Sequence, residues 1–123
     1  MFTADQIVAH LVGDYILQSD WMANEKTKQS FAAGVHAVAY TLPFLFITQS
    51  VAALAFICGT HFLIDRFRLA RYVVWFKNGQ WSSPITATGY SDDKPAFLSV
   101  WLLIIADNTL HILCNGVAIM AWG

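Results

Sequence analysis

The chain has 123 residues, enough for one domain, and a formal net charge of −1. Hydrophobic residues make up 57% of the chain and charged residues only 12%, whereas a soluble globular domain usually has about 25% charged residues. This composition disfavours a soluble domain and favours an integral membrane protein.

The first predicted helix covers residues 5–22 and mixes polar with apolar residues. His10, Asp14, Gln18 and Asp20 interrupt the segment, while its apolar positions recur at a helical spacing that gives one face to lipid and the other to protein. A signal peptide would have a basic start and an unbroken apolar stretch, and this segment has neither. We interpret it as a short or re-entrant first helix.

Three longer apolar runs follow, at residues 30–48, 51–64 and 95–123. The first two contain no Asp, Glu, Lys or Arg, and the third contains only Asp107. Because about 20 apolar residues in a helix cross the hydrocarbon core, each run predicts a transmembrane helix. The expected fold is therefore all-α, a polytopic membrane four-helix bundle in which residues 1–123 form a single domain.

The basic residues all fall in the connections that lie on one side of this bundle. They are Lys26, Lys28, Arg66, Arg68, Arg71, Lys77 and Lys94. Positive charge is enriched in cytoplasmic loops, so we expect these loops in the cytoplasm and both termini outside. The predicted location is the inner, or cytoplasmic, membrane.

All four histidines lie in predicted helices, and three of them have an aspartate four residues away. Residues at this spacing share one face of a helix, so each pair presents an imidazole beside a carboxylate. The pairs are His10 with Asp14, His61 with Asp65, and Asp107 with His111, and His36 stands alone on the second helix.

These seven side chains are the candidate metal ligands. An aspartate at the centre of a membrane helix costs about 2.5 to 3.5 kcal/mol on insertion scales, so three of them need compensation. A divalent cation supplies it, and imidazole with carboxylate suits Zn most, with Mn or Fe as alternatives. Seven ligands suffice for two ions, or for one ion with further aspartates that orient the histidines. A proton or ion pathway and purely structural polar packing are the competing interpretations.

The opening motif His10-Leu-Val-Gly-Asp14-Tyr-Ile-Leu-Gln-Ser-Asp-Trp-Met22, with the later His and Asp residues, resembles a family of small bacterial and phage membrane proteins of unknown function. More distantly, the scattered His and Asp in membrane helices resemble membrane-bound proteins assigned as metal-dependent hydrolases. That second resemblance implies a hydrolytic role for the seven residues. It does not imply the nucleotide chemistry of soluble HD-type phosphohydrolases, in which His and Asp are adjacent.

The leading functional prediction is a metal-dependent membrane hydrolase acting on an ester or phosphoester of a lipid or lipid-linked substrate. A bound divalent ion would activate water, Asp14 or Asp65 could act as general base, and Arg66 and Arg68 could hold a headgroup. We expect membrane lipid as a partner and no nucleic acid, and we leave a homo-oligomer open.

Two other functions remain open. The same His and Asp residues could relay metal ions or protons in a transporter or channel. Alternatively, the chain could be a regulatory membrane protein that binds a host partner through the loop at residues 75–94.

Overall fold

The structure is a computed structural model that describes residues 2–123, and it is helical throughout with no strand in that range. The elements in chain order are α1 (Ala4–Leu11), the π-helical turn η1 (Val12–Ile16), α2 (Asp20–Glu25), α3 (Ser30–Thr41), the 3-10 segment η2 (Leu42–Phe46), α4 (Val51–Arg66), α5 (Leu69–Lys77) and α6 (Ala96–Trp122). The prediction of an all-α fold is confirmed.

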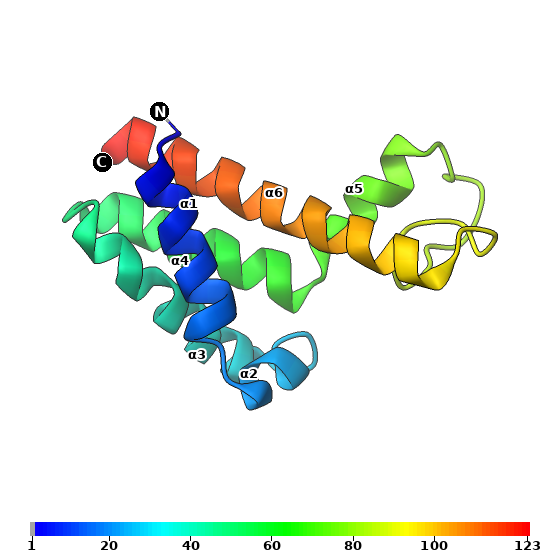
Figure 1. The fold of residues 1–123 in the computed structure, drawn as a ribbon, viewed down its shortest axis with the longest axis horizontal. Helices are drawn as coiled ribbons and strands as arrows, with labels where there is room; N and C mark the ends of the chain where they lie inside the picture. Colours follow the sequence, from blue (N-terminus) through cyan, green and yellow to red (C-terminus); the bar gives the residue numbers. More distant parts are fainter. Residues whose placement is uncertain (1) are drawn as a thin grey trace.

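Helix α6 runs along most of the molecule and organises the other elements (Figure 1). Helix α4 packs against α6 on one side and against α3 on the other, and α1 also contacts α6. The two chain ends lie close together at one end of α6, whereas α5 and the loop that follows it lie at the other end (Figure 1).

Helix α6 has 27 residues and is long and apolar enough to cross a membrane. Within residues 2–123 no other helix passes that test, because the apolar segment Ser30–Phe46 is shorter and α4 has 16 residues. A helix of 16 residues, such as α4, spans about 24 Å, less than the roughly 30 Å of a hydrocarbon core. The structure therefore contains one candidate membrane span, and the polytopic four-helix arrangement is not established by helix length.

The first predicted helix is divided in the structure. Helix α1 passes into η1, the chain leaves helical geometry after Ile16, and α2 begins at Asp20 with the Ser19 hydroxyl accepting a hydrogen bond from the Met22 amide. Asp20, one of the polar residues that interrupt the first predicted helix, is the first residue of α2. The break lets residues 20–28 turn across the end of the bundle.

Gly13 explains why η1 lies so close to α3. A Cβ atom at this position would stand 2.6 Å from Tyr40 Cδ2 and 2.9 Å from the Tyr40 carbonyl oxygen. Only glycine permits that approach, which carries the next residue, Asp14, against the side chains of α3.

The chain bends between α4 and α5, and α5 continues toward the end of α6 that lies away from the chain ends (Figure 1). Arg68 adopts a left-handed conformation with φ of 52°, after which α5 begins. Helix α5 buries Ala70 and Val74 and exposes Tyr72 and Phe76, which agrees with the amphipathic character of its sequence.

An apolar cluster fills the bundle on the side of the chain ends. Its buried members are Ala9, Tyr40, Phe44, Ala53, Ile57 and Ala118. The helices α1, α3, α4 and α6, which carry the four histidines, each contribute to this cluster, so the histidines lie next to a packed apolar layer.

Candidate metal centre

The six side chains that come together are supplied by four elements. Asp14 comes from η1, His36 from α3, His61 and Asp65 from α4, and Asp107 and His111 from α6. The three histidines are at most 1% exposed, and Asp14 and Asp65 are also buried. A cluster of ionisable groups this deep in an apolar bundle requires compensation of charge.

The first group comprises Asp14, His36, His61 and Asp65, which offer ligand atoms within 4.8 Å of one another. His36 Nε2 lies 3.1 Å from Asp14 Oδ1, 3.2 Å from Asp65 Oδ2 and 2.8 Å from His61 Nε2. His61 Nε2 lies 3.4 Å from Asp14 Oδ1 and 3.0 Å from Asp65 Oδ2. All four atoms therefore surround one small volume.

These distances fit a tetrahedral ligand shell. Bonds of about 2.0–2.2 Å from zinc to nitrogen or oxygen imply ligand-to-ligand edges of about 3.4 Å. Five of the six edges are those given above, and they run from 2.8 to 3.4 Å. The two imidazole nitrogens that face each other cannot both donate, whereas both can bind a shared cation. This group of buried residues can hold a metal ion.

A second group adjoins the first and comprises Asp14, Asp107 and His111. His111 Nε2 lies 3.4 Å from Asp107 Oδ2 and 3.1 Å from Asp65 Oδ1. Asp14 is common to both groups, and Asp65 contacts histidines of both. The two groups form one continuous centre.

His10 was also a candidate ligand, and the structure places it beside the two groups rather than in either. Its Nε2 lies 2.7 Å from Asn108 Oδ1, and its Nδ1 lies 2.7 Å from the Tyr40 hydroxyl. Asn115 Nδ2 donates to that hydroxyl over 2.6 Å. Because the Asn115 amide donates to Tyr40, the Tyr40 hydroxyl donates to His10 Nδ1 and His10 Nε2 donates to Asn108, which leaves no imidazole lone pair for a metal.

Tyr40 is a residue of the site that the sequence analysis did not single out. Its ring stacks on His61 with centroids 3.6 Å apart and planes 16° apart. Among residues 2–123, the Nδ1 atoms of His36 and His61 have no hydrogen-bond partner, so ring packing rather than a second hydrogen bond orients these imidazoles. Tyr40 lies one helical turn after His36, on the same face of the helix, and this spacing could have identified it from the sequence.

Lys26 is the second addition, since the sequence indicated only a topological role for it. Its Nζ lies 3.0 Å from Asp65 Oδ2, and its side chain is 18% exposed. Burial alone would lower the pKa of Lys26, but the carboxylates of Asp65 and Asp14 outweigh burial and hold the pKa above its usual value. Lys26 therefore places a permanent positive charge at the edge of the centre.

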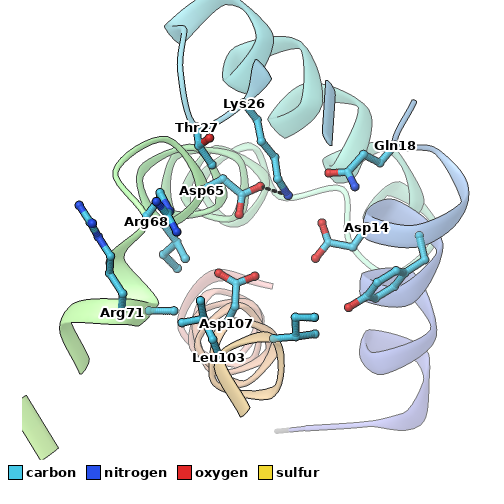
Figure 2. Close-up of a pocket in the computed structure, with 13 residues that line it drawn as sticks. Asp14, Gln18, Lys26, Thr27, Asp65, Arg68, Arg71, Leu103 and Asp107 are labelled. Atoms are coloured by element: carbon cyan, nitrogen blue, oxygen red, sulfur yellow. Dashed lines mark ion pairs between the residues drawn. The ribbon is translucent and has the colours of Figure 1, made fainter. Parts of the chain in front are cut away.

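A cavity of about 260 Å³ leads from the carboxylates toward the surface. Figure 2 shows Asp14, Asp65 and Asp107 around this space, with Lys26 above it and Arg68 and Arg71 on one side. The apolar part of the wall is formed by Ile64, Ala70, Leu103 and Ile104. The cavity thus combines cations, carboxylates and an apolar wall.

The two arginines predicted to hold a headgroup are placed differently. Arg68 lines the cavity and donates a hydrogen bond to the Ala87 carbonyl. Arg66 does not line it, and instead donates to the Thr27 carbonyl and to the Ser30 hydroxyl. Arg66 thereby ties α4 to the connection between α2 and α3, while Arg71 stands at the cavity.

Sequence comparison gives information on the chain as a whole and assigns no role to individual residues of the site. Residues 2–121 match a family described as protein of unknown function (DUF3307). The chain belongs to this family. Membership agrees with the expected resemblance to a family of unknown function, and it supports neither the first-helix motif nor hydrolase activity. No curated protein and no solved structure matches the chain.

Proposed function

We propose that this member of the family is a membrane-embedded, metal-dependent hydrolase that cleaves a phosphoester of a lipid or lipid-linked substrate. The observation that carries the proposal is the first group, Asp14, His36, His61 and Asp65, at the inner end of a cavity with a cationic rim. A buried metal beside an accessible anion-binding surface is what metal-assisted hydrolysis requires.

The membrane setting is supported by the outer surface of the helices. Large apolar side chains are exposed on several elements, including Ile16, Phe31, Phe46, Val51 and Phe97. Exposed apolar area on this scale is unfavourable in water but suits a lipid-facing surface. In our proposal α1 with η1, α3 with η2, and α4 join α6 in the membrane, with the basic loops cytoplasmic and both termini outside.

The cavity wall favours a phosphoester over a neutral ester. Lys26, Arg68 and Arg71 provide three cations that match the negative charge of a phosphate. Leu103 and Ile104 lie on α6, the candidate membrane span, and offer an apolar path for an acyl chain. A lipid whose headgroup entered the cavity could keep its tail in the bilayer.

The reaction follows from this placement. A divalent ion held by the first group, on taking water as a fifth ligand, would lower the pKa of that water to about 7 and polarise the phosphoryl group. The water oxygen would bond to phosphorus as the bond from phosphorus to the lipid alcohol oxygen breaks. The proton released would pass to an oxygen of Asp14 or Asp65 that does not bind the ion, and then to the leaving alkoxide.

The test is hydrolysis by the purified protein in detergent. We would supply Zn, Mn or Fe and measure product release from phosphatidic acid and phosphatidylglycerol in mixed micelles. The substitution His61→Ala is expected to reduce turnover at least about 100-fold, because it removes a proposed ligand of the metal ion. Thr60→Ala is the matched control, since the Thr60 hydroxyl bonds carbonyls of its own helix and the Cys114 side chain, none of which belongs to the centre. Turnover that survives His61→Ala, or no cleavage of either lipid by metal-loaded protein, would contradict the proposal.

Transport of ions by the same residues has less support. On the side of the chain ends, the apolar cluster around Tyr40, Phe44 and Ile57 closes the bundle above the centre. The large apolar side chains of this cluster narrow the route from the centre to that side. Metal or proton flux in proteoliposomes, without any change to lipid, would favour transport instead.

A further inference from the structure

We infer that the centre holds two divalent ions bridged by the carboxylates of Asp14 and Asp65. The first ion is that of the proposed function, and the inference rests on it. The second ion would be bound by Asp107 and His111, which the proposed function does not use.

Asp65 has the geometry of a bridging carboxylate. Its Oδ2 atom faces the first group, 3.2 Å from His36 Nε2 and 3.0 Å from His61 Nε2. Its Oδ1 atom faces the other way, 3.1 Å from His111 Nε2. One carboxylate therefore presents its two oxygens to histidines of two different groups.

Asp14, on η1, belongs to both groups. It supplies a ligand atom to the first group with His36, His61 and Asp65, and to the second group with Asp107 and His111. With both carboxylates shared, each ion has four protein donors, two of its own and two bridging. That number suits a tetrahedral ion or a larger shell completed by substrate and water.

The spacing of the two groups suits a two-metal centre. The rings of His61 and His111, one from each group, have centroids 4.1 Å apart. Ions in two-metal hydrolytic sites are separated by about 3.5–4 Å, and they hold the attacking and leaving oxygens of one substrate. The two histidines are thus close enough to serve neighbouring ions.

Charge also favours a second ion. Three carboxylates surround the centre, and one divalent ion with the Lys26 ammonium would only neutralise them. A second divalent ion would leave the centre positive, which is the condition for binding a phosphate dianion. Asp107 has the most exposed carboxylate of the three, with 31% of its side chain exposed, and it lines the cavity. The second ion would therefore face the substrate.

The experiment is a titration of metal-free protein in detergent with Mn²⁺, followed by electron paramagnetic resonance. We expect wild-type protein to bind two equivalents and to show the spectrum of an exchange-coupled pair. Asp107→Asn and His111→Gln should each bind one equivalent and show an isolated ion. Thr109→Ala, on the exposed face of α6, is the matched control and should bind two.

The outcomes separate the two proposals. One equivalent in the wild type, unchanged in Asp107→Asn, would overturn the second site and leave the proposed function standing. Two equivalents without exchange coupling would overturn the bridges. No binding by the wild type would overturn both proposals. Circular dichroism of each variant checks that lost binding does not reflect lost helix, and His111→Gln keeps a hydrogen-bonding group so that the bundle can still fold.

Discussion

At the scale of single residues, the histidines differ in what their ring nitrogens contact. His36 and His61 point Nε2 atoms at a common point, whereas both nitrogens of His10 are engaged by Tyr40 and Asn108. These three histidines are buried to nearly the same extent, yet they have different roles. Substitution of each one can distinguish a ligand from a supporting residue.

Replacing His10 should weaken metal binding without removing it. His10→Ala is expected to retain the wild-type number of bound ions and to lower affinity about 10–100-fold, as for residues that support ligands. His36→Ala should lose the ion of the first group. Elemental analysis with chelator competition measures both, and equal loss of metal from the two variants would identify His10 as a direct ligand.

The Tyr40 hydroxyl should contribute to stability. Tyr40→Phe keeps the ring on His61 but leaves the buried groups of His10 and Asn115 without their partner. We expect a loss of about 1–3 kcal/mol in the free energy of unfolding. Thermal unfolding in detergent would measure this loss. Tyr72→Phe is the control, because Tyr72 is exposed on α5, and an equal effect of the two substitutions would exclude a special role for Tyr40.

Removing the charge of Lys26 should strengthen metal binding. The ammonium lies 3.0 Å from Asp65 Oδ2, so it repels a cation bound by that oxygen. Lys26→Met is expected to raise Zn affinity at least several-fold, measured by calorimetry against a competing chelator. Lys28→Met, a nearby lysine outside the cavity lining, should leave affinity unchanged. Weaker binding in Lys26→Met would mean that Lys26 organises Asp65 rather than competing with the metal.

At the scale of elements, the approach of η1 to α3 decides where Asp14 lies. The π-helical turn widens the backbone at Asp14, and such turns occur frequently at functional sites. Gly13 brings that turn onto Tyr40. The position of one ligand therefore depends on a backbone contact between two elements.

Substitution of Gly13 tests this dependence. Gly13→Ala places a methyl group 2.9 Å from the Tyr40 carbonyl oxygen, so η1 must move away from α3. We expect about a 10-fold or greater loss of metal affinity, as when a ligand loses its support. Gly34→Ala is the matched control, since a Cβ there meets nothing within 4 Å. Equal metal affinity in the two variants would show that η1 can shift without moving Asp14.

At the scale of the whole molecule, the arrangement of the chain ends bears on topology. The chain ends lie at one end of the molecule, and α5, which carries Arg71 and Lys77, lies toward the other (Figure 1). An even number of membrane crossings would produce that arrangement, as the four proposed helical crossings do. The positive-inside rule then gives the direction.

Reporter fusions test the proposed topology. Alkaline phosphatase fused after Gly123 should be active and a fluorescent protein fused there should be dark, because the C-terminus is expected outside. Fusions placed within residues 78–94 should give the reverse result. A fluorescent C-terminal fusion would contradict the topology, whether or not the metal centre is present.

The sequence by itself determined the all-helical fold class and the supply of candidate ligands, whereas α5 and the division of the first predicted helix came from the structure. Helical periodicity fixes that residues four apart share a face, so the pairs His61 with Asp65 and Asp107 with His111 could be identified without any tertiary information. Helix ends were less accessible to this reasoning, because the break after Ile16 accompanies the packing of α2 against α3, which helical periodicity does not show.

The tertiary structure alone decided which ligands act together. His10 pairs with Asp14 in sequence, yet Tyr40, Asn108 and Asn115 hold His10, and Asp14 turns toward His36 on another helix. The reason is that periodicity sets the relation of side chains within a helix, whereas the rotation and separation of neighbouring helices are set by packing, such as that of Gly13 on Tyr40.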